Sequence, residues 1–323
     1  MRTLTYILCL ICALAAIPVV ASGTPSVKGE TVSEAFVTNQ NGDELSIVSL
    51  TTLKVTDTIK LSGKPAGIAV APGGKLAFVT APEGKELFVL DVDARKIARR
   101  MKIGDGPLGV AAHPTNGRVY VADWYDDDIS VVDPVAGKVL AEIQVGQSPS
   151  GLAVTPDGAL LLSADRDSNQ VSIIDTRTNT RIGTLAVGTH PFGVTIDRDG
   201  ERAYVANVIS NDVSVIDIAS RSVIATVPVG STPYAVALAN GHAFVTDQHA
   251  GTVSVIDLKA LEVIKVIDVG EYPEGIAATP DGASIYVACW FDNVLQRIDP
   301  ETLAVTDEVS VGDGPRAFGL FLR

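Results

Sequence analysis

The chain has 323 residues, of which 46% are hydrophobic and 20% are charged, and this balance excludes an intrinsically disordered protein. Its formal net charge of −13 argues against binding to nucleic acid or to an anionic lipid surface, because like charges repel at long range. The same charge favours a basic or cationic partner, although acidity also serves solubility alone.

The first 21 residues have the layout of a secretory signal peptide. Arg2 precedes an uncharged, apolar run from Leu4 to Val20, and Val19-Val20-Ala21 resembles a small-residue cleavage site. We therefore predict cleavage after Ala21, a periplasmic or secreted protein without stable membrane insertion, and a mature net charge of −14, since Arg2 is the one charge removed. The alternative is a retained membrane anchor, because the run is only marginally long enough to span a bilayer.

The cysteines indicate no disulfide and no redox motif in the mature chain. Cys9 and Cys12 have C-x-x-C spacing, but they lie in the segment that we expect to be removed. Cys289 is then the one cysteine left, so an internal disulfide is excluded. Residues 22–34 are small and polar, and they predict a flexible leader.

From residue 35 onward the chain repeats one unit seven times. Equivalent positions are 42 residues apart, except for one interval of 40, and they are Val37, Val79, Val121, Ser163, Val205, Val245 and Val287. A fixed period of this length, built only of short strands, is typical of a β-propeller. We predict that residues 35–323 form one all-β, seven-bladed β-propeller.

Each unit contains four strand patterns. In the third copy, residues 118–123 and 129–133 are rich in aliphatic and aromatic side chains, and residues 138–145 alternate. A break at Gly146-Gln-Ser-Pro149 precedes a fourth strand at 151–155. The pattern predicts four antiparallel strands per blade, with the inner strands apolar on both faces because neighbouring blades cover them.

Two kinds of loop join these strands. The loop before each innermost strand follows Gly-x-x-Pro, as in Gly104-Asp-Gly-Pro107, and is one residue shorter at Gly63-Lys-Pro65. The opposite loops are hairpin turns such as Pro156-Asp-Gly158, and the shorter Asn240-Gly241 explains the 40-residue interval. Gly104–Gly109 matches G-x-G-x-x-G, but a strand follows it where a dinucleotide site needs a helix, so the match is accidental.

The two ends of the repeat array predict a closed ring. The first copy begins at the second strand of a blade, and the chain ends in Pro315–Arg323, an innermost strand with nothing after it. We expect this C-terminal strand to complete the first blade. Closure would remove exposed strand edges, so we expect a soluble monomer.

These residues resemble a known family. Tyr120-Val-Ala-Asp123, Tyr204-Val-Ala-Asn207 and Tyr286-Val-Ala-Cys289, together with the Gly-x-x-Pro loops, are similar to YVTN-type β-propeller repeats over about residues 33–323. Such repeats occur in YncE-like exported bacterial proteins and in archaeal surface-layer proteins. The repeat pattern is also similar to the large subunit of quinoprotein amine dehydrogenases, where the propeller docks a smaller cofactor-bearing chain. The resemblance implies the fold, and it leaves open whether the chain is a binding platform, an enzyme subunit or a scaffold.

A residue present in every repeat is expected to hold the blade, whereas a residue present in one or two copies is free to hold a ligand. One set of carboxylates ends an equivalent strand before each turn, where Asp caps backbone amides, and we interpret it as structural. The set is Asp91, Asp133, Asp175, Asp217, Asp257 and Asp299.

Strand direction places the Gly-x-x-Pro loops and the loops after each second strand on one face. Side chains that differ between the copies gather there, and both tryptophans occupy the same slot. We predict a ligand- or partner-binding site at a concave mouth around the central channel. The alternative is that the tryptophans cap the blade ends and that Glu274 pairs with Arg316. The candidate residues are Trp124, Tyr125, Arg166, His190, Phe192, Tyr234, His249, Glu274, Trp290, Phe291 and Arg316.

Motifs for catalysis are lacking. The sequence has no H-E-x-x-H, no G-x-S-x-G and no C-x-x-C-H, so we predict no catalytic residue, no metal and no cofactor of its own. Two weaker metal hypotheses remain, one for His190, His249 and Asp247 and one for Ca²⁺ at Asp126-Asp-Asp128. Cys289 is expected to be a small, half-buried residue and no nucleophile, because no histidine neighbours it in sequence.

Together these features favour an exported, non-catalytic binding or scaffold module that recognises a protein or a small ligand on its aromatic face. The alternative is a propeller subunit of a periplasmic redox enzyme of the quinoprotein amine dehydrogenase type, docking a cofactor-bearing partner chain. A propeller lactonase or similar hydrolase is a third hypothesis, but it requires convergent acids and histidines that this sequence does not assemble.

Overall fold

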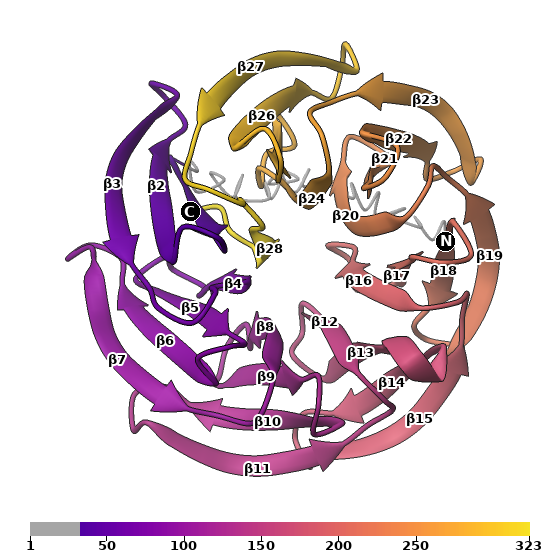
Figure 1. The fold of residues 1–323 in the computed structure, drawn as a ribbon. Coiled ribbons are helices and arrows are strands. Elements are labelled where there is room, and N and C mark those ends of the chain that lie inside the picture. The colour runs from indigo at the N-terminus through magenta and orange to yellow at the C-terminus, as the bar shows by residue number, and fades with distance from the viewer. Residues whose placement is uncertain (1–32) are drawn as a thin grey trace, which may run out of the picture. The chain divides into compact units, whose positions relative to one another are not determined.

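A computed structural model describes residues 33–323 (Figure 1). The predicted signal peptide (1–21), Cys9, Cys12 and the leader up to residue 32 lie outside the described residues. The first strand begins at Glu34, one residue before the start that the repeats predict.

Seven twisted β-sheets surround a central axis, and each sheet is one blade of the ring (Figure 1). Blade 1 contains β1 (Glu34–Asn39), β2 (Glu44–Ser49) and β3 (Lys54–Lys60). Blade 2 contains β4 (Gly67–Val70), β5 (Leu76–Ala81), β6 (Glu86–Asp91) and β7 (Lys96–Lys102). Blade 3 contains β8 (Pro107–Ala112), β9 (Val119–Asp123), β10 (Asp128–Asp133) and β11 (Lys138–Gln144). Blade 4 contains β12 (Pro149–Val154), β13 (Leu160–Asp165), β14 (Gln170–Asp175) and β15 (Thr180–Ala186), with the one-turn 3-10 helix η1 (Arg166–Ser168) after β13.

Blades 5 to 7 repeat the same order. Blade 5 contains β16 (Pro191–Ile196), β17 (Arg202–Asn207), β18 (Asp212–Asp217) and β19 (Ser222–Pro228). Blade 6 contains β20 (Pro233–Ala239), β21 (His242–Asp247), β22 (Thr252–Asp257) and β23 (Glu262–Asp268). Blade 7 contains β24 (Pro273–Ala278), β25 (Ile285–Cys289), β26 (Val294–Asp299) and β27 (Ala304–Ser310). The last strand is β28 (Phe318–Leu320). The predicted seven-bladed propeller with four strands per blade is confirmed.

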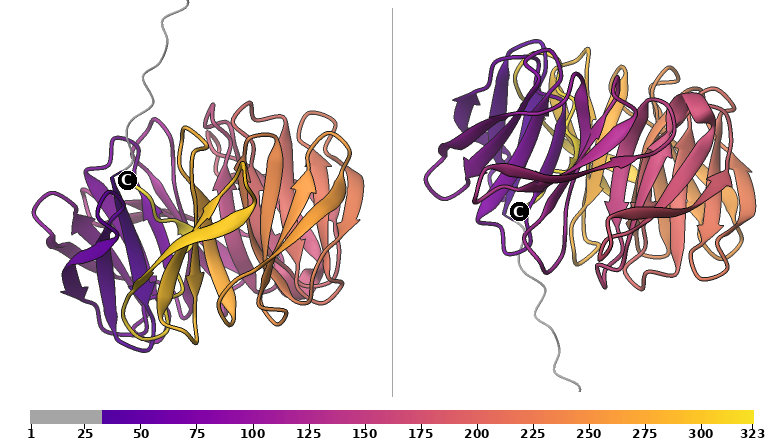
Figure 2. Two further views of the ribbon diagram at one scale, coloured as in Figure 1. Left: turned by 90° about the horizontal axis from the view of Figure 1, so that it is seen from above. Right: turned by 90° about the horizontal axis from the view of Figure 1, so that it is seen from below.

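Strands within a blade are antiparallel and run between the two faces of the ring (Figure 2). The second and third strands are buried on both sides because neighbouring blades cover both faces, whereas the outermost strands are mostly exposed or half-buried. In β11, for example, Val139 and Leu140 are exposed and Ile143 is buried.

The C-terminal segment closes the ring, as the repeat ends predict. Its two ends form antiparallel bridges with β1, from Pro315 to Asn39 and from Leu322 to Ala35, while β28 between them pairs in parallel with β4 of blade 2. The N–H of Phe36 donates to the Phe321 carbonyl oxygen at 2.8 Å. The segment therefore completes blade 1 and also joins it to blade 2.

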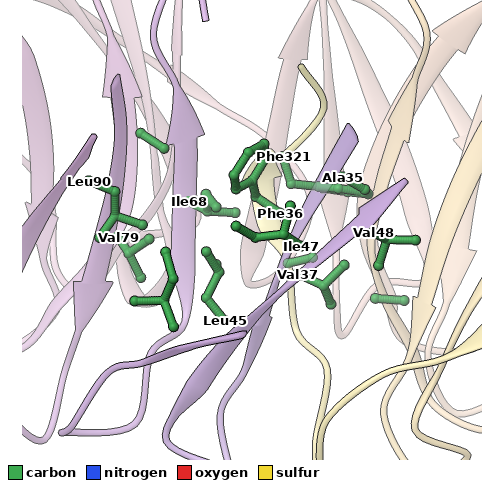
Figure 3. Close-up of a cluster of buried hydrophobic side chains, with 14 of the residues drawn as sticks. Ala35, Phe36, Val37, Leu45, Ile47, Val48, Ile68, Val79, Leu90 and Phe321 are labelled. Carbon is green, nitrogen blue, oxygen red and sulfur yellow. The ribbon is translucent and has the colours of Figure 1, made fainter. Parts of the chain in front are cut away.

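Apolar side chains fill the space between blades. Figure 3 shows one such cluster between blades 1 and 2, where Phe321 packs against Phe36 and Ile68. Phe321 is fully buried, and the burial of a phenylalanine side chain stabilises a fold by about 1.5–3 kcal/mol. The last residues of the chain thus contribute to the core as well as to the strand ladder.

The small residue two positions after each loop proline is explained by the close approach of the innermost strands. A Cβ atom on Gly109 would lie 1.8 Å from the carbonyl oxygen of Ser150 in the next blade. A Cβ atom on Gly151 would lie 2.4 Å from the carbonyl oxygen of Phe192. Glycine allows neighbouring backbones to meet at the axis, and larger side chains there would force the ring apart.

Candidate functional site

Two families of loops lie side by side on one face of the ring, which we call the loop face. They are the Gly-x-x-Pro loops before the innermost strands and the loops after the second strands. The N–H of Trp124 donates to the carbonyl oxygen of Gly106 at 2.9 Å, and the N–H of Trp290 donates to that of Tyr272 at 3.1 Å. Each blade therefore presents a paired set of loops at this face.

A buried aspartate at the end of the second strand holds the Gly-x-x-Pro loop in blades 3 and 4. The carboxylate of Asp123 accepts hydrogen bonds from the N–H groups of Gly106, Tyr125 and Asp126 at 2.9–3.0 Å. Sequence reasoning missed this role, although the recurrence of Asp or Asn after Tyr-Val-Ala was a usable signal. Asp165 accepts from the N–H of Gly146 in the same way. The other equivalent buried residues are Asn39, Asn207 and Asp247, and the two asparagines donate to side chains of the third strand.

The axis at the loop face is filled by side chains. Phe192 packs on Tyr234 with ring centroids 4.5 Å apart and on Phe318 at 4.9 Å, and Leu108 belongs to the same buried cluster. We call Leu108, Phe192, Tyr234 and Phe318 the axial plug; each is at most 6% exposed. The predicted concave mouth is therefore closed by aromatic packing, and Phe192 and Tyr234 face their neighbours in the plug.

Glu274 and Arg316 form a buried ion pair beside the plug. This is the pairing that the sequence analysis gave as the alternative to a role in ligand binding. Nε of Arg316 lies 3.2 Å from Oε2 of Glu274 and donates to the Tyr234 hydroxyl at 2.9 Å. Gln248 donates to the other Glu274 oxygen at 2.8 Å, and Arg316 donates to Gln40 at 3.1 Å. Burial raises the pKa of Glu274 to about 7, against the opposing charge of Arg316. The two side chains thus pair with each other inside the fold, and Oε2 of Glu274 has no hydrogen-bond partner beyond this ion-pair contact.

Trp124 is partly buried and lies between the plug and a charged cluster. Its ring is 6.2 Å from that of Phe192, and the guanidinium of Arg166 lies 5.4 Å above it. Arg166 pairs with Asp167 at 2.5 Å, and Nε2 of His190 lies 3.8 Å from the same carboxylate. Burial opposes ionisation of Asp167, but a hydrogen bond from Ser148 and the Arg166 charge together hold its pKa below the ordinary value.

The exposed candidates occupy one slot at the loop tips. Tyr125 is 73% exposed and Phe291 is 62% exposed, and His249 is exposed at the equivalent position of blade 6. The Phe291 ring lies 5.1 Å from Tyr272, which lies 5.5 Å from His249. Trp290, which precedes Phe291, is partly buried.

Two further residues of the loop face were missed. Ile209 is 57% exposed in the same tip slot of blade 5, and an aliphatic residue in a loop gave no chemical signal. Tyr272 sits before its loop proline and connects Phe291 to His249. The predicted residues thus divide into a buried axial set and an exposed ring of tips.

The remaining sequence hypotheses have structural accounts. Cys289 is fully buried, in contrast to the half-buried position expected, and burial raises the pKa of its thiol to about 12, so it is no nucleophile at neutral pH. The repeated Asp residues cap turns as predicted; Asp133, for example, accepts from the N–H groups of Val135 and Ala136. Among residues 33–323, no group of three or more His, Cys, Asp and Glu side chains is arranged to hold a metal ion.

Within Asp126-Asp-Asp128 each carboxylate has its own surroundings. Asp126 accepts from the N–H of Asp105, and Asp127 accepts from that of Ser148. Burial raises the pKa of Asp128 to about 6, and the nearby charge of Glu142 adds to the effect. The first two carboxylates are thus engaged in holding the neighbouring Gly-x-x-Pro loops.

Comparison with known proteins agrees with this architecture. A model of the family described as YNCE-like beta-propeller matches residues 26–118. A comparison of the sequence with curated proteins gave no match. Across residues 33–323 no helix has the length and apolar character needed to cross a membrane.

Solved structures with the same fold have low sequence identity. Hydrazine synthase of Kuenenia stuttgartiensis is 22% identical with a TM-score of 0.73, and the match covers 79% of this chain and 89% of that chain. A functionally unknown protein from Desulfotomaculum acetoxidans DSM 771 is 16% identical with a TM-score of 0.77, covering 89% of this chain and 100% of that one.

The dihydro-heme d1 dehydrogenase NirN in complex with DHE is 12% identical with a TM-score of 0.67, covering 90% of this chain and 76% of that one. At these identities the likeness concerns the fold alone. The resemblance predicted from the repeats is confirmed: the chain is a seven-bladed β-propeller whose residues 26–118 match the YNCE-like beta-propeller family.

Proposed function

We propose that this chain is an exported, non-catalytic binding module that recognises a basic protein partner through the exposed tips of its loop face. The main support is the exposure of Tyr125 and Phe291 at a loop position where the fold does not need an aromatic residue. The same slot holds Asn41, Glu83 and Asp167 in other blades of the same fold. Folding alone therefore does not account for the aromatic side chains, and exposed aromatics are enriched in protein interfaces.

The arrangement favours a protein over a small ligand on this face. The axial plug fills the position where a small molecule would otherwise enter the ring, so the accessible features are loop tips spread around the rim. Hydrogen bonds such as those to Asp123 hold these loops in one conformation, which reduces the entropy lost on binding. A partner that spans several blades could contact several tips at once.

Charge supports a basic partner. Lys85 and Arg166 are each paired with an acid, Asp105 and Asp167. Complementary charge accelerates association and selects partners. The exposed acids on these loops are Glu83, Asp105, Asp126, Asp167, Glu271, Asp292 and Asp313.

Affinity capture from an extract of the source organism tests the proposal, with the mature chain as bait. We expect a basic protein that is retained by wild type and lost, by at least tenfold, with the Tyr125→Ser/Phe291→Ser double variant. The control is Val135→Ser, because Val135 is 75% exposed in a turn on the opposite face. Equal capture by wild type and by a folded double variant would refute the proposed face.

A second candidate is a propeller subunit that docks a cofactor-bearing redox chain. One solved structure of this fold is named as a dehydrogenase in complex with DHE, although at 12% identity. The same loop face would then receive the partner. The capture experiment separates the two functions, because a redox partner would carry visible absorbance and a purely scaffolded protein would not.

A further inference from the structure

The opposite end of the axis contains a cavity of about 380 Å³. Its inner end is formed by Phe318 of the plug and by Gly109, which follows Leu108. Toward the opposite face, the cavity is surrounded by aliphatic residues at the ends of the innermost strands. Examples are Val70 in β4, Ile196 in β16 and Leu320 in β28. We call this blind cavity the axial channel. Its volume lies within the range of small-molecule sites.

We propose that the axial channel binds a medium-chain aliphatic carboxylate, with its hydrocarbon chain along the axis and its carboxylate at Arg198. The lining is mainly apolar: besides Thr155, Thr195, Thr279 and Arg198, the residues that line it are glycine, proline, phenylalanine or aliphatic. Leu320 at the mouth is 69% exposed, and contact with a hydrocarbon chain would remove its apolar surface from water. The axial plug stops the chain at a fixed depth, so the head group must remain at the mouth.

Arg198 determines the sign of the head group. It is the one charged residue among those that line the channel, and within residues 33–323 its guanidinium forms no ion pair. Hydrogen bonds from Thr279 at 2.6 Å and from the Ala283 N–H at 3.0 Å lower the pKa of Asp281, and the Arg198 charge adds to this effect. This carboxylate is therefore already engaged. The guanidinium therefore remains available to a carboxylate, its best-matched partner.

Alternative occupants are distinguished by the same features. A cationic amphipath would place its charge against Arg198, and a short polar anion would leave the aliphatic wall in contact with water. The site is also independent of the proposed protein-binding face, because the axial plug lies between the axial channel and the loop tips.

Calorimetric titration of the mature chain with octanoate, decanoate and dodecanoate tests the proposal. We expect the affinity to rise about fourfold for each methylene group buried. Dodecyltrimethylammonium and acetate are the comparison probes, and both should bind at least tenfold more weakly than dodecanoate. Equal binding of the cationic probe, or no binding of any carboxylate, would overturn the proposal.

Variants locate the bound chain. Ala112→Phe and Ala278→Phe each place a ring in the channel from a different blade, and either should weaken dodecanoate binding at least tenfold. Ala98→Phe is the matched control, because Ala98 is exposed on the outermost strand β7. Arg198→Gln should weaken dodecanoate about tenfold and abolish its advantage over the cationic probe. The Tyr125→Ser/Phe291→Ser variant should bind dodecanoate like wild type, and binding that survives both folded channel variants would contradict the site.

Discussion

The two ends of the innermost strands differ sharply although one repeat encodes both. At the loop face the strands begin with Leu108, Phe192 and Tyr234, which pack around the axis with Phe318. At the opposite face they end in partly exposed aliphatic residues such as Ala112 and Ala278, which leave a cavity. The repeat fixes the backbone at both ends, and the side chains that face the axis decide whether each end is filled.

The C-terminal segment contributes to both ends, so its removal tests them together. Deletion of residues 315–323 removes Phe318 from the plug and Phe321 from the core between blades 1 and 2. Truncation of a buried phenylalanine costs about 3–5 kcal/mol, and two such losses are comparable with the whole stability of a domain. We expect no folded monomer by size-exclusion chromatography and circular dichroism. A soluble truncated monomer of unchanged stability would contradict closure by this segment.

Single substitutions compare the filled end with the open end. Phe192→Ala should lower the free energy of unfolding by about 3–5 kcal/mol, because it leaves a cavity among Trp124, Tyr234 and Phe318. Leu320→Ala should change it by less than about 1 kcal/mol, because this side chain is 69% exposed. Urea unfolding measures both, and similar losses for the two variants would argue against the difference between the ends.

The buried ion pair allows a double-mutant cycle at the filled end. Glu274→Ala should cost about 3 kcal/mol, since it leaves the Arg316 guanidinium without its carboxylate next to Tyr234. The Glu274→Ala/Arg316→Met double variant should cost less than the single variant, because no unpaired charge remains. If the two single losses simply add, the pair is not coupled as the geometry indicates.

Stability should depend on pH through the buried acids. The pKa of Glu274 is raised to about 7, and the pKa values of Asp128 and Asp247 are raised to about 6, in each case chiefly by burial. A raised carboxyl pKa means that folding favours the protonated form, so this contribution is complete below the ordinary pKa near 4 and is lost as the pH rises through 6 to 7.

Aspartates in the hairpin turns act in the opposite direction. Hydrogen bonds from turn amides and hydroxyls hold the pKa values of Asp157, Asp175 and Asp217 below the ordinary value, so their contribution is lost as the pH falls below about 4. We expect the melting temperature to rise from pH 8 to about pH 5 and to fall again in stronger acid. Asp128→Asn should reduce the difference in unfolding free energy between pH 5 and pH 8 by about 1 kcal/mol. An unaltered pH dependence would count against the burial of this carboxyl.

The fold was predictable because the same pattern of strands and turns recurs in all seven repeats. The Gly-x-x-Pro loops, the turn residues and the seven equivalent Val or Ser positions predict blade number, strand order and closure, and the structure confirms them. The parallel pairing of β28 with β4 was not predicted, since it depends on how the last strand fits between two blades.

The site was only partly predictable, because packing at the axis joins residues from different blades. Sequence placed Phe192 and Tyr234 at the axis but could not show that Phe318 would complete a plug and close the mouth. The sequence is equally compatible with a Glu274–Arg316 pair and with a pair of charges that faces a ligand, and the 3.2 Å distance shows that they pair. Tyr125 and Phe291 were found by comparing copies, whereas Ile209 was passed over as ordinary.

The pairing of the last residues with the first strand has a consequence for biosynthesis. Arg323 donates its N–H to the carbonyl oxygen of Glu34, a contact between opposite ends of the described chain. Blade 1 therefore stays incomplete until residues 315–323 have been synthesised, whatever the order in which the other blades form. Contacts of such long sequence separation form slowly, so the nascent polypeptide exposes one edge of β1 until those residues are available to pair with it.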